Sequence, residues 1–268
     1  MTEKRFQFGL NWQNFAHTLD EEKISDATQS LSKMLAKESL KGCNFLDAGC
    51  GSGLFSLAAC RLGVDSVVSF DYDPDSVHCA AALRDKFGST YNWQVFPGDV
   101  LDKTWLTALG RFDIVYSWGV LHHTGKMWEA LENITLCVKD NGLLFISIYN
   151  DQAWVSNVWK FIKKFYNTSP KFLRWLMASC WFLVVIANQV IQNVWVKKPL
   201  PEWFKGSERG MNLWHDTVDW MGGYPFETAK PSELVDFFTK RGFEVVTKKL
   251  KTGSGCNELV LRKIYKQE

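Results

Sequence analysis

The chain has 268 residues, of which 46% are hydrophobic, and its formal net charge is only +2. This size and composition suit one domain with an ample core, or one domain that carries an insertion. The near-balanced charge gives no overall case for nucleic-acid or acidic partners. The seven cysteines include no Cys-x-x-Cys pair, so neither a disulfide framework nor a zinc site is expected. No apolar signal stretch follows Met1, and we therefore expect a cytoplasmic protein.

Short apolar runs alternate with helical patterns along most of the chain. Helices are predicted at 20–40, 53–62, 74–87, 101–109, 125–138 and 231–241. Strands are predicted at 44–48, 66–70, 92–96, 112–117, 142–149, 243–250 and 257–264. Strands that alternate with helices indicate an α/β fold, with a parallel sheet and helices on both of its faces. An atypical segment at 151–226 interrupts the alternation.

A glycine-rich motif joins the first predicted strand to the helix that follows it. In Asp47-Ala-Gly-Cys-Gly-Ser-Gly53, the three alternating glycines allow a tight turn and a close approach of a ligand to the backbone. The helix start adds N–H groups without helical partners, so the motif indicates a nucleotide-type site at the carboxyl end of this strand. A dinucleotide fingerprint would need its third glycine at position 54, which is Leu.

This motif, the acidic residue Asp47 and the order of the predicted elements resemble the class I S-adenosylmethionine (SAM)-dependent methyltransferases. The resemblance implies a Rossmann-like seven-stranded sheet in which the seventh strand, here 257–264, inserts antiparallel between the fifth and sixth. It also implies SAM as cofactor and S-adenosylhomocysteine (SAH) as product. No cluster of metal-ligand residues stands out in the sequence, so no metal is expected. The resemblance covers 41–150, the expected SAM-binding core, and 227–268, the expected C-terminal completion of the core, but not 151–226. We expect a helical lid insert at 151–226 and an N-terminal helical cap at 1–40.

The resemblance places the cofactor at the ends of successive strands. Asp71, which ends the second strand, would accept both ribose hydroxyl hydrogens; the alternative role of helix N-cap suits Asp73 better. Asp99 and Val100 would contact adenine, unless Asp99 is only a turn residue. The residues expected to bind or position the cofactor are Trp12, Asp47, Gly49, Cys50, Gly51, Asp71, Tyr72, Asp99, Val100, Ser117 and Trp118.

Some of these residues have specific expected roles. Asp47 would hydrogen-bond the backbone of the glycine loop rather than the cofactor. Trp12 lies in an aromatic N-terminal segment that would close over the cofactor, or else pack against the first helix. Trp118-Gly-Val-Leu121 stands where amine and base N-methyltransferases often carry Asn/Asp-Pro-Pro-Tyr, and this difference argues against that kind of N-methylation.

Methyl transfer from SAM needs an acceptor placed in line, and a base if the acceptor is a hydroxyl. His215 is the leading candidate base, with Asp216 or Asp219 to orient it, in a block that loosely resembles bacterial ubiquinone-type O-methyltransferases. His122 and His123, after the fourth strand, are the other candidates. The structural alternatives are that His215 and Asp216 pin the lid and that His122 and His123 begin a helix. Substrate contacts are expected at Tyr149, Asn150, Asp219 and Tyr224.

The insert is rich in tryptophan and in basic residues. Residues 152–201 contain seven Lys or Arg and no Asp or Glu. The centre, 175–187, is apolar almost all round, but it is shorter than the roughly 20 residues that cross a bilayer. Three interpretations remain. They are a lid packed on the domain or on a second copy in a homodimer, a membrane-surface segment at 172–196 that would place the protein at the inner membrane face, and a basic aromatic cradle for RNA.

Together these features predict a SAM-dependent methyltransferase that O-methylates a small acceptor, such as an apolar, natural-product or cell-surface metabolite. One alternative is an RNA methyltransferase that uses the basic aromatic insert, although nucleic acid fits the overall charge poorly. The other is a SAM-binding protein without turnover, whose insert is an interaction or membrane-surface module.

Overall fold

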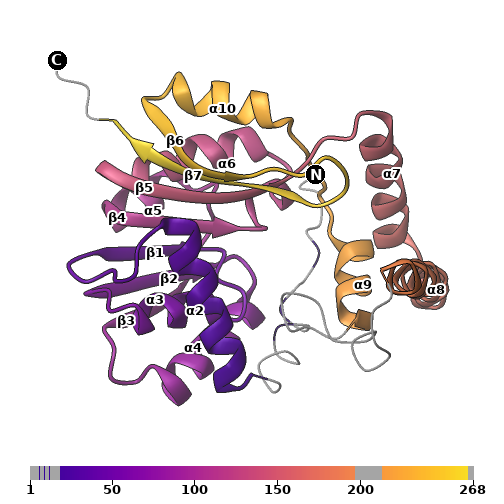
Figure 1. Ribbon diagram of the computed structural model, residues 1–268, viewed down its shortest axis with the longest axis horizontal. Coiled ribbons are helices and arrows are strands. Elements are labelled where there is room, and N and C mark those ends of the chain that lie inside the picture. Colours follow the sequence, from indigo (N-terminus) through magenta and orange to yellow (C-terminus); the bar gives the residue numbers. More distant parts are fainter. Residues whose placement is uncertain (1–5, 7–8, 10–11, 13–18, 197–212, 265–268) are drawn as a thin grey trace.

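The computed structural model describes residues 6, 9, 12, 19–196 and 213–264, with the side chain of His215 left out. A central sheet carries helices on both faces, and the helices of the insert lie to one side of it (Figure 1). The predicted α/β class is therefore confirmed.

The sheet has seven strands in the order β3-β2-β1-β4-β5-β7-β6. The first five strands run parallel, and β7 is antiparallel to both β5 and β6. This is the predicted Rossmann-like topology, with the seventh strand between the fifth and the sixth. The strands are β1 (Asn44–Ala48), β2 (Ser66–Asp71), β3 (Trp93–Pro97), β4 (Phe112–Trp118), β5 (Val138–Tyr149), β6 (Phe243–Lys249) and β7 (Cys256–Lys263).

The helices outside the insert lie close to their predicted positions. They are α2 (Glu21–Leu35), α3 (Leu54–Arg61), α4 (Pro74–Phe87), α5 (Lys103–Leu109), α6 (Met127–Ile134) and α10 (Pro231–Thr239). The helix predicted at 20–40 ends earlier, because Ala36 adopts a left-handed φ of 51°. Asp73 caps α4 by accepting a hydrogen bond from the backbone N–H of Asp75, and Pro74 follows in the first turn, as predicted.

Two hydrophobic clusters hold the helices against the sheet. One joins α5, α6 and α10 to the sheet and includes Leu131 and Phe238. The other joins α2, α3 and α4 to the opposite face and includes Leu31 and Leu57. All four side chains are fully buried. Because both faces are covered by these clusters, the strand ends are the part of the sheet that a ligand can reach.

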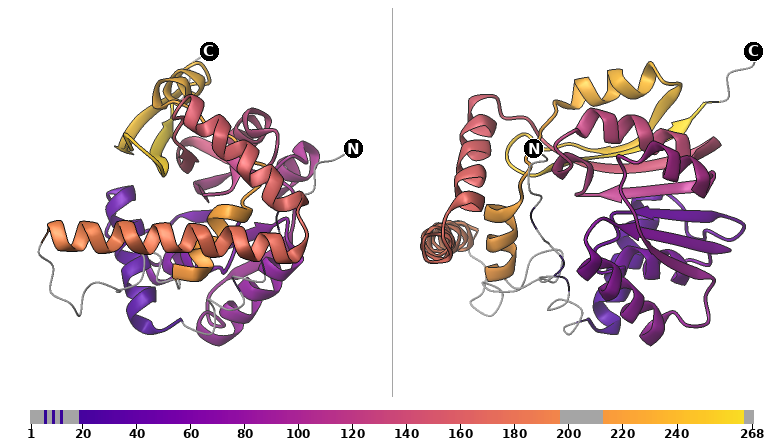
Figure 2. Two further views of the ribbon diagram at one scale, coloured as in Figure 1. Left: turned by 90° about the vertical axis from the view of Figure 1, so that its right-hand side faces the viewer. Right: turned by 180° about the vertical axis from the view of Figure 1, so that it is seen from behind.

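The insert forms three helices in the described part of the chain: α7 (Trp154–Thr168), α8 (Lys171–Trp195) and α9 (Leu213–Gly222). In Figure 1 and in the right-hand view of Figure 2, α7 and α8 are the outermost layer, and α9 lies between α8 and the sheet. Aromatic side chains join the three helices. The Trp159 ring lies 4.7 Å from that of Trp181 and 5.2 Å from that of Trp220, between ring centroids. The helical insert is therefore confirmed.

Candidate active site

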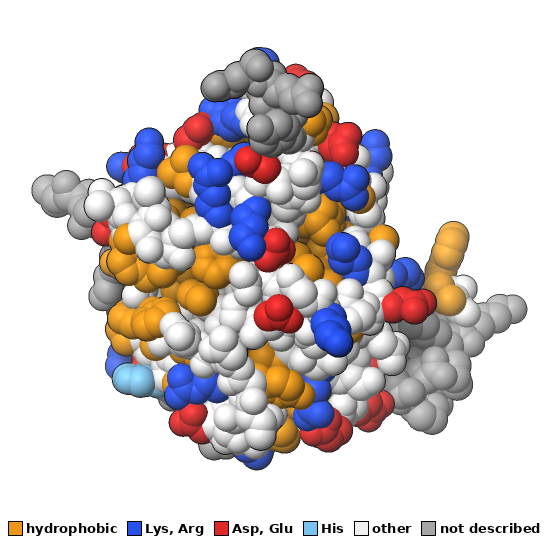
Figure 3. All heavy atoms as spheres, turned by 90° about the vertical axis from the view of Figure 1, so that its left-hand side faces the viewer, with side chains coloured by type: hydrophobic (Ala, Val, Ile, Leu, Met, Phe, Trp, Pro, Cys, Tyr) orange, Lys and Arg blue, Asp and Glu red, His pale blue; other side chains and the backbone are white. Residues whose placement is uncertain are grey.

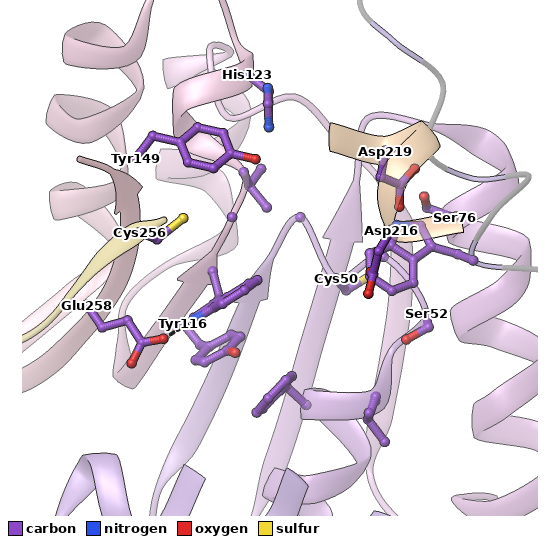
Figure 4. Close-up of a pocket in the computed structure, with 18 of the residues that line it drawn as sticks. Cys50, Ser52, Ser76, Tyr116, His123, Tyr149, Asp216, Asp219, Cys256 and Glu258 are labelled. Carbon is purple, nitrogen blue, oxygen red and sulfur yellow. Dashed lines mark hydrogen bonds between the residues drawn. The ribbon is translucent and has the colours of Figure 1, made fainter. Parts of the chain in front are cut away.

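The carboxyl ends of β1, β2, β4 and β5 open into a cavity of about 1680 Å³. Helix α9 and the inner sides of α7 and α8 form the opposite wall, so the insert closes over the crevice where parallel sheets bind ligands. A drug-sized ligand occupies a pocket of roughly 300–1,000 Å³. The cavity therefore has room for a cofactor and an acceptor together. Figure 4 shows His123 and Tyr149 on one side of it, and Asp216 and Asp219 of α9 on the other.

The glycine loop follows β1 directly and lines the cavity. Gly49 and Gly51 have positive φ values of 80° and 52°, a conformation that side chains with a Cβ rarely adopt. A Cβ at Gly51 would lie 2.9 Å from the ring of Trp12. Trp12 thus packs directly on the loop and lines the same cavity, and its expected role as a cover of the cofactor stays a prediction.

Asp71 ends β2 beside this loop. One carboxylate oxygen accepts the backbone N–H of Gly51 at 2.9 Å, and the other accepts that of Asp73, also at 2.9 Å. Burial raises the pKa of Asp71 to about 6, although these hydrogen bonds act in the opposite direction. Asp73, not Asp71, is the N-cap of α4. The two backbone hydrogen bonds hold the Asp71 carboxylate at the cavity wall, and its role as ribose ligand stays a prediction.

Asp47 differs from its predicted role. Its carboxylate accepts a hydrogen bond from the hydroxyl of Ser56 in α3, whereas the backbone N–H groups of Gly49 and Cys50 donate to the carbonyl of Phe70. The loop is therefore held by β2, and Asp47 instead joins β1 to α3. Burial raises the pKa of Asp47 to about 7, against the effect of the Ser56 hydrogen bonds.

This raised pKa predicts that Asp47→Asn stabilises the protein without SAM at alkaline pH. Between the ordinary pKa of 3.8 and about 7, the folded protein keeps a proton that the unfolded chain has lost, so stability falls as pH rises through this window. One pKa unit corresponds to about 1.4 kcal/mol. We expect urea denaturation to give Asp47→Asn a gain on the order of 1–3 kcal/mol at pH 8 and none near pH 4.

Asp113→Asn is the matched control, because it should behave in the opposite way. Although burial alone would raise the pKa of Asp113, hydrogen bonds from the Asn44 backbone and from Lys139 lower it. A lowered carboxylate pKa stabilises the folded state at neutral pH, so Asp113→Asn should lose stability at pH 8. A loss of stability at pH 8 for Asp47→Asn as well would show that the Ser56 hydrogen bond outweighs the burial of the charge.

The remaining predicted cofactor residues divide into two groups. Asp99, Val100, Cys50, Tyr72 and Trp118 all line the cavity. Asp99 also accepts the backbone N–H of Leu101, so it holds the turn as well. Ser117 is different, since it is fully buried and its hydroxyl donates to the carbonyl of Ala48. Its side chain therefore joins β4 to β1, and the expected contact of Ser117 with the cofactor through backbone atoms stays a prediction.

The two adjacent histidines have different surroundings. His123 lines the cavity, and its Nδ1 lies 2.7 Å from the carbonyl oxygen of Pro225. Because a carbonyl only accepts, Nδ1 carries the proton and Nε2 is the nitrogen that can accept one. His122 is fully buried behind the cavity, and its Nδ1 accepts the backbone N–H of Tyr149 at 3.3 Å. His122 is therefore a structural residue rather than the catalytic residue that was predicted.

Of the predicted substrate contacts, some line the cavity and one does not. Tyr149, Asp219 and Tyr224 line the cavity, as does Asp216. Asn150 does not: its amide donates to the carbonyl of Gly253 and accepts from Asn257. It therefore ties the end of β5 to the β6–β7 turn, and its prediction as a substrate contact is wrong. The side chain of His215, the leading candidate base, lies outside the described residues.

Two charged residues in or next to the cavity wall were not predicted from the sequence. Glu258 of β7 accepts a hydrogen bond from the Trp118 indole at 3.0 Å and lines the cavity. Lys163 of α7 is fully buried beside the cavity wall, with its ammonium 4.2 Å from the ring centroid of Trp220. Burial lowers the pKa of Lys163 to about 7, although Asp219 acts in the opposite direction. The sequence feature that could have predicted the burial of Lys163 is its position between Trp159 and Tyr166 on one face of α7.

Solved structures with this fold include complexes with SAH. The magnesium protoporphyrin IX methyltransferase from Synechocystis PCC 6803, with bound SAH, gives a TM-score of 0.54 at 13% identity over 90% of this chain and 83% of that chain. PKMT2 from Rickettsia typhi, in complex with the same product, gives 0.56 at 14% identity over 88% of this chain and 52% of that chain. These likenesses show that the chain shares its fold with these methyltransferases.

The family model described as a methyltransferase domain matches residues 15–248 of the sequence. The chain therefore belongs to the family of methyltransferase domains. A ribosomal protein L11 methyltransferase of Xanthomonas campestris pv. campestris is 36% identical over 82 residues, 30% of this chain and 27% of its own. A ubiquinone biosynthesis O-methyltransferase of Pelagibacter ubique is 30% identical over 111 residues, 41% of this chain and 44% of its own. The match spans less than half of either relative. The predicted enzyme class and cofactor are confirmed.

Proposed function

We propose that this enzyme transfers the methyl group of SAM to a hydroxyl group of a small, largely apolar acceptor, and that His123 is the general base. The observation that carries this proposal is the contact between His123 Nδ1 and the carbonyl of Pro225. It fixes the ring and leaves Nε2 as the basic nitrogen in a residue that lines the cavity.

The chemistry needs little more than this arrangement. The sulfonium of SAM is a good leaving group, so the acceptor oxygen must be held in line with the methyl group. As the carbon–oxygen bond forms and the carbon–sulfur bond breaks, Nε2 of His123 takes the hydroxyl proton. SAH and the methyl ether are the products. The ring of Tyr149, 5.4 Å from that of His123 between centroids, would help to position the acceptor.

The lining of the insert side supports an apolar acceptor. Trp159, Trp181, Val185 and Trp220 contribute apolar surface to this wall, beside Asp216 and Asp219 of α9. Aromatic rings offer apolar faces for planar or aliphatic groups. The partial similarity to a ubiquinone biosynthesis O-methyltransferase is consistent with a hydroxylated ring as the acceptor.

Measuring SAH release with matched acceptors tests the proposal. A panel of apolar phenols and aliphatic alcohols should include active compounds, whereas the corresponding methyl ethers and amines should be inactive. Total RNA and ribosomal protein L11 serve as the competing acceptor classes. Turnover confined to amines, RNA or protein would overturn the proposal, as would SAM binding without turnover on any class.

A further inference from the structure

The outward side of α7 is apolar. Trp154, Val158, Phe161 and Phe165 are exposed, with 72%, 45%, 71% and 47% of their surface accessible. Their spacing of four, three and four residues places them on a single helical stripe. A helix on the surface of a soluble domain normally turns such a stripe inward, but here the stripe points away from the domain.

The outward side of α8 continues this pattern over 25 residues. Its large exposed apolar side chains are Phe172, Trp175, Leu176, Leu183, Val184, Ile191, Val194 and Trp195. Within the described parts of the chain, α8 is the one helix long and apolar enough to cross a membrane by length and composition, and only 6% of its most apolar window is buried. We refer to the exposed apolar side chains of α7 and α8 together as the outer face.

The inner sides of both helices are already occupied. Trp159 and Tyr166 of α7, and Ala178 and Trp181 of α8, pack with Met221 of α9 in one hydrophobic cluster. The outer face therefore cannot be buried by rotating either helix, because rotation would expose this cluster and open the cavity wall. Contiguous apolar surface of this kind on a folded domain marks an interaction site.

The charge of the insert restricts the partner. Residues 152–201 contain no Asp or Glu, while Lys160, Lys164 and Lys171 are exposed on α7 and α8. The face on the opposite side of the molecule carries Lys and Arg interspersed with Asp and Glu (Figure 3). A second copy docked on the same face would place the lysines of α7 and α8 against each other, and residues 152–196 contain no Asp or Glu to offset them. Anionic lipid headgroups match the lysines, and acyl chains match the apolar side chains.

We propose that the outer face rests on a lipid bilayer that contains anionic lipids, with α7 and α8 lying in the plane of the interface. An in-plane orientation follows from the packing of α8, because Trp181 and Val185 line the cavity and a bilayer-spanning α8 would leave that wall. Tryptophan rings and lysine stems are suited to the interface, where apolar and hydrated groups meet. This inference does not depend on the identity of the methyl acceptor.

Co-sedimentation of the full-length protein with vesicles tests the proposal. Phosphatidylcholine vesicles with and without phosphatidylglycerol should be compared at low and high salt. We expect strong binding to the anionic vesicles that weakens with salt. The double variant Phe161→Ser/Leu183→Ser should reduce the partition coefficient at least tenfold. Replacing Lys160, Lys164 and Lys171 by Gln should reduce it about 10- to 100-fold on anionic vesicles and little on neutral ones.

Val246→Ser is the matched control, because Val246 is 39% exposed on β6, outside the insert; it should leave vesicle binding unchanged. SAM binding by each variant, measured by calorimetry, confirms that it folds. No sedimentation of the folded wild-type protein with anionic vesicles at low salt would overturn the proposal. So would a dimer in solution that the Phe161→Ser/Leu183→Ser variant converts to monomer without any vesicle binding, since the outer face would then be an interface between copies.

Discussion

Replacing His123 by Ala is expected to lower kcat by a factor of about 10² to 10⁴, the usual contribution of a positioned general base. Affinity for SAM should change by less than about threefold, because the contact made by His123 is to Pro225 and not to the glycine loop. The measurement is SAH release at saturating SAM with the best hydroxyl acceptor, together with calorimetric titration of SAM.

His78→Ala is the control, since His78 lies exposed on α4 and should keep full turnover. If His123→Ala retains kcat within about threefold of the wild type, the base lies elsewhere. His215 is then the next residue to replace, because it adjoins Asp216 in the helix that forms the opposite wall of the cavity.

Asp71→Asn is expected to weaken SAM binding by about 10- to 100-fold, because a hydrogen bond to a charged group contributes roughly 1.5–3 kcal/mol. The loss has two sources: the amide accepts less strongly from ribose hydroxyls, and its NH2 group opposes the N–H of Gly51 or Asp73. The pH dependence should also change. Since the pKa of Asp71 is raised to about 6, wild-type affinity should fall as pH drops through 6, while that of Asp71→Asn should stay flat.

Asp65→Asn provides a matched control. Asp65 also accepts a backbone N–H, that of Gly42, but it lies before the start of β2, at the opposite end from Asp71. Its replacement should leave SAM affinity and the pH profile unaltered. An unchanged affinity in Asp71→Asn would remove Asp71 as a ribose ligand and leave it as a support for the glycine loop.

The sheet and the position of the cofactor crevice could be predicted because their signals are local. Apolar runs, helical periodicity and the cap pair Asp73-Pro74 act within a few residues of one another. The start of β5 could not be predicted in this way. Val138 pairs with Phe112 across a register shift in β4, and such an irregularity depends on the neighbouring strand rather than on the local sequence.

The assignment of the polar residues depended on distant contacts. His122 and His123 are adjacent in sequence, and contacts with Tyr149 and Pro225, 27 and 102 residues away, distinguish them. Asn150 looked suitable for a ligand at a strand end, yet Gly253 and Asn257 already bind its amide. The Asp47 carboxylate accepts a hydrogen bond from a hydroxyl of α3 instead of from the glycine loop. A sequence motif therefore predicts which residues lie near such a site. Which of their side chains face the ligand depends on tertiary contacts.

The position of β7 has a consequence for folding during synthesis. This strand lies between β5 and β6 and pairs with β5 from Leu143 to Tyr149. The seven-stranded sheet therefore cannot be completed until residue 263 has left the ribosome. Contacts of such long sequence separation form late. At that stage α8 has already emerged with its apolar side chains uncovered. The nascent chain therefore has an interval in which a chaperone, or a membrane surface, can capture the insert before the cavity is complete.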